Sequence, residues 1–294
     1  MATKEEKIQL NIQKKEMKLR RKNEKAEAKR EKKELKRIRK EEKKREKMVD
    51  KRVSLRLKRE ETLEKGPEIR ATRKRNEAPK LYVLEEIGNA TSHGCGAIFA
   101  LIAMTLMLMK SHTPLMIASA IVYGICMFLM FFNSCLYHSW KWGSKVKRLW
   151  RRFDYSSIYL QIVGTFAPLQ LVELAIEYGN TGQIIGIIYF IIMWIAVITG
   201  ITFACVFGPG KFRKLHFTLY FVIGWSGLSF IPGFFIHNRI PLFLWILGGG
   251  IVYSLGMIPF GMLKRKPSAH FIWHFFVIAG AVIQWIGIYL YTFA

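Results

Sequence analysis

Residues 270–293 read HFIWHFFVIAGAVIQWIGIYLYTF, an apolar run without a lysine, arginine, aspartate or glutamate. A helix needs about 20 mostly apolar residues to cross the hydrocarbon core of a bilayer, so this stretch is long enough to span a membrane. His270 and His274 stand at its start, where ionisable side chains are costly and are tolerated mainly when they have a function. The stretch therefore predicts a membrane helix with a polar site at one end.

Six further apolar stretches precede this one. We expect membrane helices at residues 87–109, 114–138, 154–172, 183–207, 215–236, 241–261 and 270–293. The connections between them are short, and helices satisfy their own backbone hydrogen bonds inside a bilayer. The sequence therefore predicts an all-α fold, in which residues 81–294 form a polytopic bundle of seven transmembrane helices.

The N-terminal part of the chain has a different composition. Residues 1–65 contain 27 Lys and Arg but only 14 Asp and Glu, and the whole chain has a net charge of +25. Many Glu and Lys side chains are three or four residues apart, which supports an isolated helix. We therefore expect a basic cytoplasmic tail that is either a long helix or disordered. Residues 66–80, with Gly66, Pro67 and Pro79, predict a linker to the membrane domain.

The tail has three candidate roles. It is a solvated spacer or topology determinant, or it binds anionic lipid headgroups, which attract basic segments beside a membrane. Nucleic acid is the least favoured partner, because the first aromatic residue that could stack on a base is Tyr82. Membrane lipids are thus the expected partners of the chain as a whole.

Basic residues between the predicted helices indicate the orientation of the chain. One side carries Lys141, Lys145, Lys147, Arg148, Arg151, Arg152, Lys211, Arg213, Lys214, Lys264, Arg265 and Lys266. The opposite loops carry only Lys110 and Arg239. Because basic residues are enriched in cytoplasmic loops, we expect a multi-pass plasma-membrane protein with a cytoplasmic N-terminus and an extracellular C-terminus.

Several ionisable residues fall on the predicted cytoplasmic side. His138 ends the second predicted helix, Asp154 begins the third, and His270 and His274 share one face at the start of the seventh. Three histidines can hold a zinc ion and leave its fourth position open for water. Asp154, the only aspartate of the membrane domain, is the candidate base, and Ser134 could orient a ligand or bind an oxyanion. This set predicts zinc-dependent hydrolysis of an amide or ester.

A simpler interpretation is that each histidine only caps its helix at the membrane surface. That interpretation suits a single histidine better than three of them at one depth together with Asp154 and Ser134. Three further residues near the start of the first predicted helix, Glu86, Asn89 and His93, are expected to support the ligands and not to bind the metal.

Five motifs extend the argument to a known family. They are EEIGNATSHG at residues 85–94, NSCLYH at 133–138, RRFDYSSIYL at 151–160, GTFAP at 164–168 and HFIWH at 270–274. Together, over about residues 82–294, they resemble the hemolysin III family. This family lies within the progestin and adipoQ receptor superfamily, which includes the adiponectin receptors and is related to alkaline ceramidases.

The resemblance implies a seven-helix zinc protein with its N-terminus inside. By motif position it implies that His138, His270 and His274 bind zinc, that Asp154 lies by the zinc-bound water, and that Ser134 is the motif serine. The basic tail is outside the family pattern.

Three functions follow from these observations. The first is a ceramidase-like zinc hydrolase of a lipid amide or ester. The second is a receptor or membrane-homeostasis protein with structural zinc, which the short external loops disfavour. The third is a pore-forming cytolysin, which the family name suggests. A secreted toxin is disfavoured because no apolar signal-peptide core follows the charged N-terminus.

Overall fold

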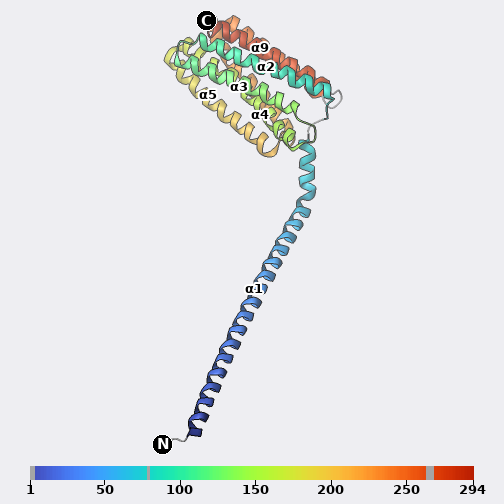
Figure 1. Ribbon diagram of the computed structural model, residues 1–294. Helices are drawn as coiled ribbons and strands as arrows, with labels where there is room; N and C mark the ends of the chain where they lie inside the picture. The colour runs from blue at the N-terminus through green and yellow to red at the C-terminus, as the bar shows by residue number, and fades with distance from the viewer. Residues whose placement is uncertain (1–3, 78–79, 263–267) are drawn as a thin grey trace. The chain divides into compact units, whose positions relative to one another are not determined.

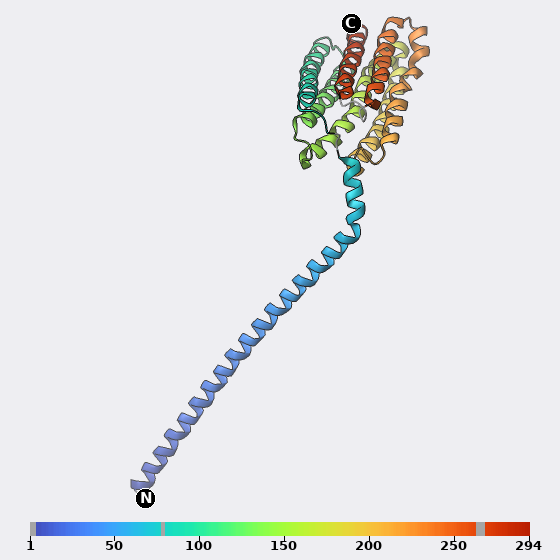
Figure 2. The same cartoon turned by 90° about the vertical axis from the view of Figure 1, so that its right-hand side faces the viewer.

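The computed structural model describes residues 4–77, 80–262 and 268–294, and all regular structure within these ranges is helical (Figures 1 and 2). The chain divides into two compact units, Met1–Arg70 and Ala71–Ala294. Four residues used in the sequence analysis, Pro79, Lys264, Arg265 and Lys266, lie outside the described ranges. The all-α prediction is confirmed.

The basic tail forms one helix, α1 (Lys4–Asn76). This agrees with the helical alternative for the tail, but the helix also runs through Gly66 and Pro67, where we expected a linker. One proline removes a single backbone hydrogen bond from a helix and costs about 3 kcal/mol. The surrounding Lys, Arg and Glu residues favour helix, so the chain stays helical to Asn76.

The membrane domain consists of helices that run alongside one another in both views (Figures 1 and 2). They are α2 (Val83–Met109), α3 (Pro114–Ser139), α4 (Lys145–Pro168), the π-helix η1 (Leu169–Glu173), α5 (Leu174–Phe207), α6 (Arg213–Trp225), the 3₁₀ helix η2 (Ser226–Phe230), α7 (Ile231–Ile236), α8 (Ile240–Met262) and α9 (Ala269–Tyr291). Helix α2 packs against both α3 and α9, while α4 packs against α3, α5 and α6. Segments far apart in sequence therefore meet at one end of the bundle.

Six stretches within the described residues are long and apolar enough to cross a membrane, and one of them runs for 63 residues from Lys145 to Phe207. A straight helix of that length would extend about 95 Å, roughly three times the hydrocarbon thickness of a bilayer. The backbone leaves the helical conformation at Gly179, with φ 59° and ψ −139°. Beyond it, Gly186 lies against the backbone carbonyl of Gln170, so the chain folds back on itself. Dividing the long stretch at Gly179 would raise the count from six to the predicted seven, and the number seven stays a prediction.

Helix α4 begins earlier than the sequence analysis predicted. Ser144 caps it by accepting a hydrogen bond from the backbone N–H of Lys147, so the helix starts at Lys145 and not at residue 154. A side-chain oxygen at this position satisfies one of the free N–H groups of the first turn. Asp154 therefore lies inside α4, and of the six basic residues assigned to the preceding loop only Lys141 is outside the helix.

The helix predicted at residues 215–236 is in fact three pieces, α6, η2 and α7. Ser226 donates to the carbonyl of Ile223 and Ser229 donates to the carbonyl of Ser226, which supports the tighter 3₁₀ turn. Pro232, at the start of α7, has no N–H to continue a regular helix. Local hydrogen bonding thus interrupts a segment whose hydropathy is uniform.

The outer surface of the domain is apolar. Isoleucines of α5 are exposed along the helix at Ile184, Ile188, Ile191 and Ile195. The buried core contains large side chains of α3 and α4 such as Tyr123, Phe131 and Tyr159. Apolar residues both inside and outside are typical of helices surrounded by lipid, and they support a protein with several membrane spans.

Candidate metal centre

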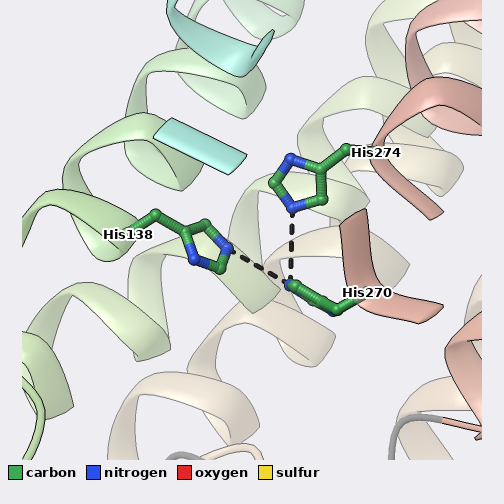
Figure 3. A group of neighbouring side chains, drawn as sticks. All are labelled: His138, His270 and His274. Atoms are coloured by element: carbon green, nitrogen blue, oxygen red, sulfur yellow. Dashed lines mark hydrogen bonds between the residues drawn. The ribbon is translucent and has the colours of Figure 1, made fainter. Parts of the chain in front are cut away.

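Three histidines converge at one end of the bundle. His138 comes from the last turn of α3, and His270 and His274 come from the first turns of α9 (Figure 3). The Nε2 atom of His270 lies 3.2 Å from Nε2 of His138 and 3.4 Å from Nε2 of His274. One ligand atom from each ring lies within 4.8 Å of the others, and all three residues are buried. Such a group can hold a metal ion.

A carboxylate fixes the ring of His138. Glu86, in the first turn of α2, has its Oε2 atom 2.7 Å from Nδ1 of His138. A carboxylate only accepts hydrogen bonds, so Nδ1 of His138 carries the proton and Nε2 presents a lone pair to the other two rings. Metal-binding histidines commonly donate their second N–H to such an acceptor.

The ring of His274 is held in a similar way. The hydroxyl of Ser92 donates to the backbone carbonyl of Asn89, at 3.1 Å, and lies 3.4 Å from Nδ1 of His274. Because its proton goes to Asn89, the oxygen of Ser92 accepts the Nδ1 proton of His274. The Nε2 atom of His274 then also presents a lone pair to the centre. Nδ1 of His270 is buried without a hydrogen-bond partner.

A buried lysine completes this network. Lys147 of α4 is only 1% exposed and places Nζ 2.9 Å from Oε1 of Glu86. It also donates to the backbone carbonyl of Tyr137, at 3.0 Å, and lies over the Tyr137 ring. Lys147 therefore neutralises the carboxylate that orients His138, and it links α4 to α2 and α3.

The two predicted catalytic residues lie together beside the histidines. Ser134 is buried one turn before His138 on α3, and its hydroxyl forms a hydrogen bond with the carboxylate of Asp154. Among the described residues, Asp154 is not in the group whose ligand atoms lie within 4.8 Å of one another. The structure therefore does not group Asp154 with the three histidines as a direct ligand of a metal ion.

His93 and Asn89 lie around the centre and outside the ligand group. The ring of His93 stacks on that of His274, with centroids 3.7 Å apart, and its two nitrogens are buried without a partner. The amide nitrogen of Asn89 lies 3.5 Å from Nδ1 of His138. The structure thus brings all eight residues singled out from the sequence to one region.

Sequence reasoning did not single out Ser92 and Lys147 as parts of the site. Ser92 stands one position before His93 within the first family motif, so its place in that motif could have identified it as a candidate residue of the site. Lys147 gave no such signal, because it was one of several basic residues assigned to a loop. Only the early start of α4 turns it into a buried partner of Glu86.

A cavity of about 170 Å³ lies deeper in the bundle, next to this centre. Its lining comes from α3, α4, α6, α8 and α9 and is mostly aromatic and aliphatic. Phe260 and Tyr155 connect the two regions, since Phe260 lines the cavity and contacts the ring of His270, and Tyr155 follows Asp154. A space suited to an apolar chain therefore lies on the other side of the Phe260 ring from His270.

Comparison with known proteins gives consistent matches. The family described as "Haemolysin-III related" matches residues 81–285. The chain is 34% identical to "Hemolysin-3" of Bacillus cereus over 214 residues. The aligned region covers 72% of this chain and 93% of that protein. It is 29% identical to "Hemolysin-3 homolog" of Bacillus subtilis (strain 168), over 71% of this chain and 95% of that protein. The human "Monocyte to macrophage differentiation factor" is 24% identical over 71% of this chain and 85% of its own length.

Proposed function

The chain belongs to the haemolysin-III related family of membrane proteins, and from this premise we propose that it is a zinc-dependent hydrolase of a lipid amide or ester. The observation that carries the proposal is the convergence of three buried histidine nitrogens, with Glu86 and Ser92 on the far side of two of the rings. Neutral imidazoles with oriented lone pairs are suitable ligands for zinc.

The residues present fit a zinc ion. His138, His270 and His274 would supply three nitrogen ligands, which leaves one position of a tetrahedral site for water or substrate. The Nε2 lone pairs of His138 and His274 both face Nε2 of His270, whose Nδ1 has no partner among the described residues, and a cation held by the three Nε2 atoms would satisfy all of them. A zinc ion bound there would polarise the carbonyl of the substrate and activate water.

Asp154 would transfer the proton of the attacking water to the leaving group, and Ser134 would support Asp154. The hydroxyl of Ser134 would donate to the carboxylate of Asp154 and hold it in place. When a water molecule attacks the acyl carbon, Asp154 takes its proton as the new C–O bond forms. Asp154 then returns a proton to the leaving nitrogen or oxygen as the old C–N or C–O bond breaks. The products are a carboxylic acid and an amine or alcohol, and general acid–base help of this kind contributes about 10²–10⁴-fold in rate.

The adjacent cavity supports a lipid as the substrate. Its apolar lining suits an acyl chain, while the histidines and Asp154 lie at the end of the bundle where a polar headgroup would remain. Lys147 and Arg151 of α4, both buried, add positive charge near that end. A bond between headgroup and chain would therefore be held beside the histidines.

Two alternatives have specific support. The same three histidines link α3 to α9, so zinc could be purely structural in a receptor or membrane-homeostasis protein. The name of the Bacillus cereus relative, "Hemolysin-3", suggests lysis of cells, and a pore-forming cytolysin is the alternative that would cause it. Both alternatives differ from the hydrolase in what they require of Asp154.

Metal analysis with a lipid assay tests the proposal. We expect the purified wild type to contain zinc, and H270A/H274A to lose it. His112→Ala is the matched control, because His112 is exposed in the connection between α2 and α3 and should leave the zinc content unchanged. Asp154→Asn should keep zinc and lose at least about a hundredfold in hydrolysis of amide and ester lipid probes.

Each alternative has its own outcome in this experiment. If Asp154→Asn retains full hydrolase activity, Asp154 is not the base. If zinc is present and wild type cleaves no lipid probe, the structural alternative gains support. If metal-free protein makes liposomes leak as fast as the wild type, the pore-forming alternative is favoured.

A further inference from the structure

The cavity contains a polar group far from the histidines. Gln161 of α4 lines it and is 5% exposed. Its Nε2 atom donates to the hydroxyl of Tyr253, at 3.2 Å, and to that of Thr165, at 3.4 Å. Its Oε1 atom is buried without any hydrogen-bond partner. A buried acceptor without a partner has lost its hydrogen bonds to water and formed no others, which costs free energy. A partner is therefore expected.

The neighbouring hydroxyl of Tyr253 also lacks one hydrogen-bond partner in the described part of the chain. The oxygen of Tyr253 accepts from Gln161, but among the described residues no acceptor is found for its proton. Thr165, in contrast, donates to the backbone carbonyl of Gln161, at 2.9 Å. Gln161 and Tyr253, which both line the cavity, therefore leave one acceptor and one donor without a partner within the described ranges, among apolar side chains.

A single hydroxyl group on a bound chain can satisfy both. It donates to Oε1 of Gln161 and accepts the proton of Tyr253 at the same time. A hydroxyl also fits if the amide of Gln161 is turned around, because it then accepts from the amide nitrogen. A plain hydrocarbon chain would leave both groups unsatisfied.

The depth of this group follows from α4. Asp154 and Gln161 are seven residues apart, so they lie on one face of the helix, about 10 Å apart along its axis. Ile158, between them, also lines the cavity. A chain whose scissile bond lies beside Asp154 would pass Ile158 and reach Gln161 near its middle.

We propose that Gln161 and Tyr253 recognise a hydroxyl group in the middle of the substrate's acyl chain. The inference rests on the proposed function, because that function places the acyl chain in this cavity. It assigns the preferred substrate class as lipids with a hydroxylated chain. Gln161 and Tyr253 are specificity residues here and take no part in bond cleavage.

Fatty acid binding to the purified full-length protein tests this inference. The probes are stearic acid and a positional series of monohydroxystearic acids, each competing with a fluorescent fatty acid. We expect the wild type to bind one mid-chain isomer about five- to tenfold more tightly than stearic acid, as one well-made hydrogen bond would give. Gln161→Leu should remove this preference and keep stearic acid binding within about twofold.

Two further variants make the test independent of folding defects. Tyr253→Phe keeps the ring and removes the hydroxyl, so it should weaken the preference even if Gln161→Leu does not fold. Gln284→Leu is the matched control, because Gln284 lines the same cavity but already donates to the carbonyl of Ile246, at 3.2 Å. It should retain the preference.

The outcomes separate this inference from the proposed function. Equal binding of all probes by wild type overturns the inference, and shows that the Gln161–Tyr253 pair only ties α4 to α8. Retention of the preference in both Gln161→Leu and Tyr253→Phe overturns it too. Selective binding without hydrolysis of any lipid would overturn the proposed function alone. Hydrolysis without selectivity would overturn the inference alone.

Discussion

At the scale of single residues, the candidate centre depends on a chain of contacts from Lys147 through Glu86 to His138. Both contacts are shorter than 3.0 Å, and the three residues belong to three different helices, α4, α2 and α3. The first contact neutralises a carboxylate, and the second sets which nitrogen of His138 carries the proton. A lysine that never touches His138 therefore supports the carboxylate that orients it.

Removing the charge of Glu86 should weaken metal binding. We expect Glu86→Gln to lower zinc affinity by about 10–100-fold, because the amide offers one acceptor oxygen to both His138 and Lys147, which weakens the hydrogen bond that fixes the ring and tautomer of His138. Competition with a chelator measures this. Glu85→Gln is the matched control, since Glu85 is in the same helical turn but accepts from the backbone N–H of Tyr82, at 3.1 Å. Equal affinities in the two variants would contradict the role of Glu86.

Removing the charge of Lys147 should destabilise the fold. Lys147→Met leaves Glu86 without its cation, and breaking a buried ion pair costs about 3–5 kcal/mol; we expect the lower end because Glu86 is 16% exposed. Thermal unfolding in detergent measures the loss. Lys145→Met, at an exposed position of the same helix, should change stability by less than about 0.5 kcal/mol. A Lys147→Met protein as stable as Lys145→Met would refute this account.

At the scale of elements, the helix ends decide what the site contains. The capping oxygen of Ser144 starts α4 at Lys145, which places Asp154 well inside a helix and Lys147 in its first turn. The N-terminal extension of α2 to Val83 places Glu86 in its first turn. Glu86 reaches His138, and Lys147 reaches Glu86, because both helices begin before the apolar stretch does.

The helix break at Gly179 should be sensitive to substitution. Its φ of 59° and ψ of −139° belong to a region that only glycine occupies easily. We expect Gly179→Ala to lower the free energy of unfolding by about 1–3 kcal/mol. Gly261→Ala is the control, because a Cβ there meets nothing within 4 Å and its φ is not positive. Similar stability of both variants, measured by unfolding in detergent, would count against strain at Gly179.

Hydropathy predicted where the membrane spans lie better than it predicted where each helix begins and ends. The apolar stretches located α3, α8 and α9 to within about two residues, because their ends coincide with changes from apolar to polar sequence. It failed at α4, where basic residues form the first turns, and at η2, where serine hydroxyls bond to the backbone. In both cases local hydrogen bonds, which hydropathy does not contain, determine the structure.

At the scale of the whole molecule, the histidine centre was predictable for a simple reason. Positive-inside bias and span counting placed His138, His270 and His274 at one depth, and ring packing in the fold brings them together. The contact of Lys147 with Glu86 and the free oxygen of Gln161 were not predictable. They depend on which helix faces which, and a single sequence does not contain that information.

The number of spans has a consequence for the two ends of the chain. Seven crossings place the termini on opposite sides of the membrane, whereas six place them on the same side. We expect an epitope at the N-terminus to bind antibody only after cells are permeabilised, and an epitope at the C-terminus to bind it in intact cells. The basic tail favours a cytoplasmic N-terminus, and a division of residues 145–207 at Gly179 would supply the seventh crossing. Detection of both epitopes under one condition would mean that residues 145–207 cross the membrane once, and the fold-back at Gly179 would then need another explanation.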